Sequence, residues 1–261
     1  MTTARLLGLH HSPWTERARW ALDHHRIPYD FEEYAPVIGE IRLRFALRAF
    51  GGKVTVPVFF ASDIVLRDSL EIVRHADATG ASSPLVPSEL EADVLAWNAR
   101  AETAFQAGRS MYVRALLDDP DALAELAPRA IPGPLRGVAA RAGTALFKRK
   151  HRLLGRSVEH DEAGMVTALD ALRAALRGDY VLGRFSLADI AMAISLQHVS
   201  PVSDEYIQLT PPARSCSTQA RLADRYADVV AWRDALYARH RRPAVAPPSA
   251  QVAEAGPTAE R

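Results

Sequence analysis

Over the first 80 residues, short runs typical of β-strands alternate with runs typical of helices. Strand-like runs are short and apolar or alternate in polarity, whereas helix-like runs repeat apolar residues at spacings of three and four. We expect strands at 5–10, 29–34, 56–60 and 64–66, and helices from Pro13 onward, at 37–50 and at 69–80. The order β-α-β-α-β-β-α requires a right-handed crossover and then an antiparallel hairpin. The sequence therefore predicts a small α/β sheet with helices packed against it.

Strand-like patterns nearly vanish in the second part of the chain. Amphipathic helices are predicted at 89–117, 161–176, 186–199 and 227–240. A Gly-, Pro- and Ser-rich stretch separates this all-α region from the first part. We therefore expect a domain at 1–80, a linker at 81–88, an all-α helical domain at 89–243, and a proline-rich, disordered tail at 244–261.

Composition excludes several classes of protein. The formal net charge of +1 gives no argument for a nucleic-acid partner. The single cysteine, Cys216, excludes a disulfide framework and a cysteine-rich zinc site within one chain. No apolar run approaches the ~20 residues that span a bilayer, and the N-terminus has no signal-peptide core. We expect a soluble, cytoplasmic protein.

One segment departs from this balanced charge. Residues 126–158 contain no acidic residue but carry eight basic ones: Arg129, Arg136, Arg141, Lys148, Arg149, Lys150, Arg152 and Arg156. A solvated helix face with a loop is the favoured interpretation. There are two alternatives: a docking patch for an anionic partner or membrane surface, and an entrance to an anionic-substrate site.

Ser12 precedes Pro13 at the start of the first expected helix. A Ser-Pro pair is typical of an N-cap, because the hydroxyl accepts from a free amide and proline tolerates the first helical position. The same position suits a thiolate, since free N–H groups and the helix dipole stabilise an anion there. Taken alone, Ser12 is interpreted as a cap.

The stretch SPWTERARWALDHHRIPYDFEEY, residues 12–34, resembles the first helix and second strand of the glutathione S-transferases. It is most similar to the tau class, with Ser-Pro-aromatic followed by Arg-x-Arg-x-Ala-Leu, and it resembles the omega class with Ser12 in place of a cysteine. The resemblance implies a thioredoxin-like N-terminal domain and an all-α second domain. It also implies that Ser12 activates the sulfur of glutathione, with Thr15 as the reserve hydroxyl.

The resemblance assigns roles to two further segments. A proline that opens a strand is ordinary structure, but in this family Pro57 is expected to follow a cis bond that frees the Val56 backbone to pair with the cysteinyl part of glutathione. Lys53 lies near the position where relatives bind the glycyl carboxylate. Asp68 and Ser69 read alone as a helix start. The resemblance implies that they hold the γ-glutamyl ammonium and carboxylate.

Ser186 and Asp189 have the spacing of a capping box before an apolar run. The resembled family carries Gly-x-x-x-Ser-x-Ala-Asp in the core of its helical domain, so we assign this pair a role in folding. Adjacent histidines, His10-His11 and His24-His25, are not expected to face one metal from a strand or helix, and no metal site is predicted. Cys216 is interpreted as an incidental thiol.

We therefore expect a transferase that conjugates glutathione, or a related low-molecular-weight thiol, to an apolar electrophile. The second substrate is expected near Trp14, Phe105, Met111 and Tyr112, although Met111 and Tyr112 also fit a helical core. A homodimer is expected from the resemblance. The alternatives are a transferase-like fold kept as a non-catalytic binding or assembly domain, and a lyase, isomerase or dehalogenase on the same scaffold.

Overall fold

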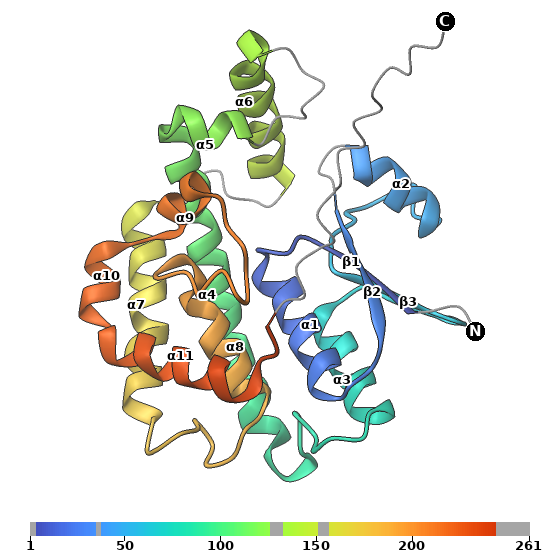
Figure 1. Ribbon diagram of the computed structural model, residues 1–261, viewed down its shortest axis with the longest axis vertical. Helices are drawn as coiled ribbons and strands as arrows, with labels where there is room; N and C mark the ends of the chain where they lie inside the picture. Colours follow the sequence, from blue (N-terminus) through green and yellow to red (C-terminus); the bar gives the residue numbers. More distant parts are fainter. Residues whose placement is uncertain (1–3, 35–37, 126–132, 151–156, 244–261) are drawn as a thin grey trace, which may run out of the picture.

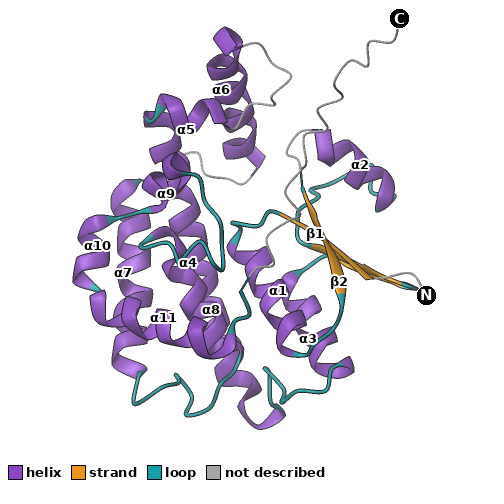
Figure 2. Ribbon diagram, in the orientation of Figure 1, coloured by secondary structure: helices purple, strands orange, loops and turns teal. Residues whose placement is uncertain are grey.

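The computed structural model describes residues 4–34, 38–125, 133–150 and 157–243. Its sheet contains β1 (Ala4–Gly8), β2 (Tyr29–Glu33), β3 (Val58–Ala61) and β4 (Ile64–Leu66), in the order β2-β1-β3-β4. β1 and β2 are parallel, and the other two pairs are antiparallel. Within the described residues, every strand belongs to this sheet (Figure 2). The predicted mixed α/β sheet is confirmed.

Alternating side chains of the strands separate the two faces of the sheet. Leu6 and Phe59 are buried together with residues of α1 (Pro13–His24) and α3 (Ser69–Thr79). Leu7 and Val58 point to the opposite face and pack with Leu43 of α2 (Ile38–Ala46). Figure 1 shows α1 and α3 between the sheet and the second, helical part of the chain. The start of α1 therefore lies where the two parts of the chain meet.

The second part of the chain is helical. Its helices are α4 (Glu91–Asp118), α5 (Pro120–Glu125), α6 (Gly133–Lys150), α7 (Val158–Ala175), α8 (Leu187–Ser195), α9 (Pro211–Ser217), α10 (Ala220–Arg225) and α11 (Ala227–His240). All nine residues of α8 are buried, and α8 and α7 pack against α4. α5 packs against α4 and α9, and α6 lies beyond it at one end of the helical part (Figure 1). No described helix has both the length and the hydropathy needed to cross a bilayer.

The predicted polar pair at the start of α8 is buried in this core. Asp189 is 0% exposed, and its carboxylate accepts from the Ser186 amide at 2.9 Å, the Ser186 hydroxyl at 3.0 Å and the Val181 amide at 2.7 Å. Burial nevertheless raises the pKa of Asp189 to about 6, because desolvation disfavours its charged form. The predicted folding role has the contacts that it requires.

Two predicted helix ends are wrong. α2 ends at Ala46 rather than at residue 50, because Arg48 adopts a left-handed φ of 50°. The Ala49 amide then donates to the Arg44 carbonyl and the Arg48 amide to the Phe45 carbonyl, which is the hydrogen-bond pattern that closes a helix. The α-helix predicted to reach residue 199 ends at Ser195 and continues as a 3₁₀ turn at 196–198.

α6 lies in the segment interpreted above as a solvated helix face with a loop, although no helix bounds were predicted there. It carries most of the basic residues singled out above: Arg136, Arg141, Lys148, Arg149 and Lys150. Arg129, Arg152 and Arg156 lie outside the described residues, as does the predicted tail at 244–261. Cys216 is buried with Leu116 and Ala122, in keeping with an incidental thiol.

Candidate functional site

The strand order brings three predicted site segments to one end of the sheet. β3 pairs antiparallel with β1, and β4 pairs antiparallel with β3. The residues that follow β1, precede β3 and follow β4 therefore lie at the same end. They include Ser12, the pair Val56–Pro57 and the pair Asp68–Ser69. Segments more than 40 residues apart in the sequence thus become neighbours.

Ser12 occupies the N-cap position of α1 with extended backbone, φ −78° and ψ 128°. Its carbonyl accepts from the Glu16 amide at 2.9 Å, as the first turn of the helix requires. Its half-buried side chain makes no capping hydrogen bond to the described amides of α1. The prediction of a side-chain cap is therefore wrong: the hydroxyl is at the positive end of the helix dipole without being used by the helix.

Thr15, the reserve hydroxyl, is in a different environment. It is fully buried, and its Oγ1 accepts from the Leu9 amide at 3.3 Å. A Cβ on Gly8 would lie 2.4 Å from Thr15 Cγ2, so the glycine allows α1 to pack closely against the end of β1. Thr15 thus fixes the start of α1 to the sheet, and its hydroxyl already has a structural partner.

Asp68 and Ser69 begin α3 but differ in exposure. Asp68 is exposed, and its Oδ1 accepts from the Leu70 amide at 2.7 Å, which is the predicted cap. Ser69 is buried, and its Oγ accepts from Arg17 Nη2 at 2.6 Å and Arg17 Nε at 3.2 Å. The serine predicted to hold a carboxylate is therefore already in contact with a guanidinium.

Arg17 was not predicted from the sequence as a residue of this site. It is 1% exposed, donates to Asn98 Oδ1 at 2.6 Å and forms an ion pair with Glu102 Oε1 at 2.7 Å. Its partners come from α3 and α4, so it joins both to α1. One feature of the sequence could have revealed it: Arg17 lies on the helix face that Trp14 and Ala21 also occupy, which is expected to be buried. A buried arginine needs acceptors from neighbouring elements.

Val56 and Pro57 complete this end of the sheet. The Val56–Pro57 peptide bond is cis, as expected from the resemblance. Val56 is half-buried and Pro57 is buried. Lys53 is exposed and lies in the loop that precedes them.

Two of the four predicted substrate-pocket residues, Trp14 and Phe105, meet where α1 contacts α4. The rings of Trp14 and Phe105 meet edge to face with centroids 5.4 Å apart, and Trp14 Nε1 donates to Glu102 Oε2 at 2.9 Å. The Arg109 guanidinium lies 4.7 Å from the Trp14 ring centroid. Phe105 is 1% exposed, so it belongs to the core, whereas Trp14 and Tyr112 are half-buried.

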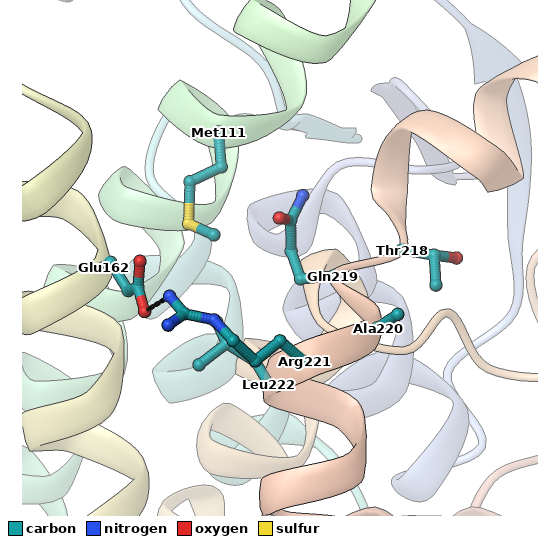
Figure 3. A pocket seen from close by; sticks show the side chains of 7 residues that line it. All are labelled: Met111, Glu162, Thr218, Gln219, Ala220, Arg221 and Leu222. Carbon is teal, nitrogen blue, oxygen red and sulfur yellow. Dashed lines mark hydrogen bonds and ion pairs between the residues drawn. The ribbon is translucent and has the colours of Figure 1, made fainter.

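Met111 lies elsewhere, because adjacent residues of a helix point about 100° apart. It borders a cavity of about 260 Å³ together with residues of α7, the 218–219 connection and α10. In Figure 3 its sulfur points toward the ion pair of Glu162 and Arg221 across that cavity. The structure therefore separates Met111 from Trp14 and Tyr112.

Two neutral histidines flank Tyr112. His198 stacks on the Tyr112 ring at 5.2 Å, and His11 lies on another side at 6.3 Å. Burial lowers the pKa of His198 to about 3 and that of His11 to about 4, with neighbouring positive charge adding to both shifts. Near neutral pH both rings are uncharged, and His198 Nδ1 is buried without a hydrogen-bond partner among the described residues.

Comparisons with known proteins agree with this architecture. Residues 11–79 match the family model of the glutathione S-transferase N-terminal domain. No curated protein matches the chain. Among solved structures, a glutathione S-transferase from Methylobacterium radiotolerans, in complex with glutathione sulfonate, is 16% identical, with 91% of this chain and 92% of that chain covered and a TM-score of 0.58.

Two more solved structures are similar in fold. A glutathione transferase family member from Pseudomonas fluorescens Pf-5, with bound glutathione, is 16% identical over 92% of this chain and 100% of that chain, with a TM-score of 0.57. Glutathione transferase Omega 3C from Trametes versicolor is 18% identical over 92% of this chain and 87% of that chain, with a TM-score of 0.54. The chain therefore has the glutathione S-transferase fold, with an N-terminal α/β part and a helical second part.

Proposed function

We propose that the protein is a glutathione transferase in which the Ser12 hydroxyl stabilises the thiolate. The observation that carries the proposal is the side chain of Ser12, which is placed at the start of α1 and makes no capping hydrogen bond to that helix. A match of the surrounding residues to a glutathione S-transferase domain supports the same reading. Glutathione, or a related low-molecular-weight thiol, is the co-substrate.

The chemical demand on Ser12 is modest. A free cysteine thiol has a pKa near ~8.5, and one pKa unit corresponds to about 1.4 kcal/mol. A charge-assisted hydrogen bond contributes about 1.5–3 kcal/mol. One bond donated by Ser12 to the sulfur would therefore lower the thiol pKa by roughly one to two units, and the dipole of α1 acts in the same direction.

The neighbouring segments would hold the rest of the tripeptide. The backbone of Val56 pairs with the cysteinyl part, Asp68 receives the γ-glutamyl ammonium, and Ser69 receives its carboxylate at the amide end of α3. Arg17 supports this last role, since its guanidinium contacts Ser69 Oγ. Lys53 would approach the glycyl carboxylate from the loop before Val56.

An apolar electrophile would bind beside Ser12, against the half-buried rings of Trp14 and Tyr112. Phe105 supports Trp14 from the core, and Met111 takes no direct part because it borders the separate cavity. A serine in place of the omega-class cysteine favours tau-like conjugation over thiol transfer. The domain division at 81–88, a homodimeric assembly and a cytoplasmic location belong to the same proposal.

Ser12→Ala tests the function. Glutathione affinity, measured by calorimetry, should change little, because the other contacts to the tripeptide remain. The pKa of the bound thiol, read from its ultraviolet absorbance, should rise by about one unit or more, and conjugation at neutral pH should fall about tenfold or more. Ser12→Cys should shift the activity toward thiol exchange, because a thiolate at a helix N-terminus is itself a nucleophile.

Thr15→Ala is the companion variant. Since the Thr15 hydroxyl accepts from the amide of Leu9, directly after β1, its loss should lower stability while leaving the pKa of the bound thiol unchanged. If Ser12→Ala keeps full conjugation activity and Thr15→Ala loses it, Thr15 is the residue that stabilises the thiolate. If wild-type protein binds no thiol at all, the proposal fails and a non-catalytic binding domain replaces it.

A further inference from the structure

Three metal-ligating side chains meet at the turn between β1 and α1, outside the roles given above. His10 and His11 lie in this turn, and Glu33 ends β2. The parallel register of the two strands sets Gly8 beside Glu33, so the turn that follows Gly8 passes over the carboxylate. One ligand atom from each of the three side chains lies within 4.8 Å of the others.

This convergence differs from what the sequence suggested. Adjacent residues of a regular strand or helix point in divergent directions, but His10 and His11 occupy a turn, and their rings meet at an 84° angle with centroids 5.1 Å apart. Both side chains can therefore reach the Glu33 carboxylate.

The hydrogen bonds of His10 orient one nitrogen toward the carboxylate. Nε2 lies 2.9 Å from the carbonyl oxygen of Gln208, an acceptor that requires Nε2 to carry a proton. The neutral ring then directs the lone pair of Nδ1 at Glu33 Oε1, 3.1 Å away. Two facing lone pairs repel, so either a proton on Nδ1 or a metal ion must lie between these two atoms. A backbone carbonyl behind the ring is also the usual outer partner of a metal-bound imidazole.

The spacing of His10 and Glu33 fits a divalent metal. Ligand atoms about 2.1 Å from one ion lie about 3.0–3.4 Å apart at the angles found in proteins, and the His10–Glu33 distance is 3.1 Å. His10 and Glu33 are half-exposed, with side-chain exposures of 40% and 47%, so an ion can enter from solvent. We propose that His10, His11 and Glu33 form a binding site for a divalent transition-metal ion such as Zn²⁺ or Ni²⁺, since imidazole nitrogens prefer these ions over Mg²⁺ or Ca²⁺.

The chain contains a natural comparison at His24 and His25. Their rings are also perpendicular, 4.8 Å apart, and His25 Nε2 lies 2.7 Å from Asp77 Oδ1. The Asp77 oxygens, however, each accept a backbone amide at 2.8 Å, one from Leu85 and one from Val86. This carboxylate is committed to the fold. Among the described residues, the Glu33 oxygens accept a backbone amide only from His10, at the longer distances of 3.3 and 3.4 Å.

The test is a calorimetric titration of the untagged full chain with ZnCl₂, repeated with NiCl₂. We expect one ion per chain, and an affinity at least about tenfold weaker in each of His10→Gln, His11→Gln and Glu33→Gln. His24→Gln is the matched control and should bind as wild type does. Circular dichroism checks that each variant is folded.

The proposal is overturned if wild type binds neither ion, which would mean that a proton alone bridges His10 and Glu33. It is equally overturned if His24→Gln weakens binding as much as His10→Gln does. Because the site consists of residues outside the proposed thiol contacts, metal binding and thiol conjugation are measured separately, and failure of one leaves the other untouched.

Discussion

Arg241 and Glu16 form an ion pair across 225 residues of sequence, with side chains 1% and 0% exposed. Arg241 Nε donates to Glu16 Oε1 at 2.7 Å and Nη2 to Oε2 at 3.2 Å, the bidentate geometry of the strongest charge-assisted pairs. Arg241 also contacts Asp23, so it joins the end of the helical part to two carboxylates of α1. The helix that begins after Ser12 is thus held by a residue that follows α11.

Arg241→Met should destabilise the protein by about 3–5 kcal/mol, because it leaves the Glu16 charge buried without its main partner. Urea unfolding measures the change. Arg239→Ala is the matched control, since Arg239 pairs with Asp179 on the surface, and it should cost at most about 1 kcal/mol. Adding Glu16→Gln to Arg241→Met should recover part of the loss. Equal effects of the two single variants would contradict the importance of burial.

Asp189→Ala should cost about 3 kcal/mol, since it removes the acceptor of three hydrogen bonds in a buried site. Ser157→Ala provides the comparison. Ser157 caps the exposed start of α7 by accepting from the His160 amide at 3.0 Å, and its loss should cost about 1 kcal/mol. The midpoints of urea unfolding compare the two variants with wild type. An unchanged midpoint in Asp189→Ala would rule out the assigned folding role.

Gly8→Ala should destabilise by about 1–3 kcal/mol, because its new methyl group would overlap the side chain of Thr15. Thr15→Ala in the same chain opens that space. The double variant should therefore be more stable than the sum of the two single effects implies. A double-mutant cycle measures this coupling, and strict additivity would show that the two residues are not in contact.

His198 gives the protein a pH dependence whose sign can be worked out. The folded state holds its pKa near about 3 and the unfolded state near ~6.5. As pH falls, the unfolded chain therefore takes up the proton before the folded protein does. The contribution of the neutral His198 ring to the free energy of unfolding is complete above about pH 6.5. Below that pH it decreases by about 1.4 kcal/mol per pH unit. Arg109 and His11 oppose protonation further.

His198→Phe should preserve stacking on Tyr112 while removing the titrating group. Between about pH 6.5 and pH 4.5, its free energy of unfolding should fall less steeply than that of wild type, by roughly 1 kcal/mol per unit. Urea unfolding at a series of pH values measures both slopes. Parallel slopes would mean that the pKa of His198 is the same in the folded and unfolded states.

Local patterns predicted the order of the elements well, because strand alternation and helical spacing are properties of neighbouring residues. The spacing of Ser186 and Asp189 likewise sufficed to identify the buried cap. The end of α2 was missed because Arg48, four residues before the left-handed Gly52, already adopts the left-handed conformation. Propensity favours glycine at such a position, and the closing hydrogen bonds outweighed it here.

The candidate site was predictable only in part, since its segments meet through tertiary contacts. Ser12 was found from its position before Pro13. The absence of a capping bond from Ser12 to the described amides of α1 was not predicted, because such a bond depends on a rotamer that the sequence does not report. Arg17 was missed because its partners Ser69 and Asn98 lie 52 and 81 residues away. The placement of His10 and His11 in a turn was not predicted either, and the rule that neighbouring side chains diverge applies only to regular strands and helices.

The pairing of Glu16 with Arg241 also imposes an order on biosynthesis. A ribosome releases the N-terminal part of a chain first, so α1 emerges long before the arginine that neutralises it. Until then the Glu16 carboxylate lacks the bidentate partner that makes its burial tolerable. The nascent α/β part therefore lacks the bidentate partner of its buried Glu16 carboxylate, and α1 gains that contact only when synthesis has passed residue 241.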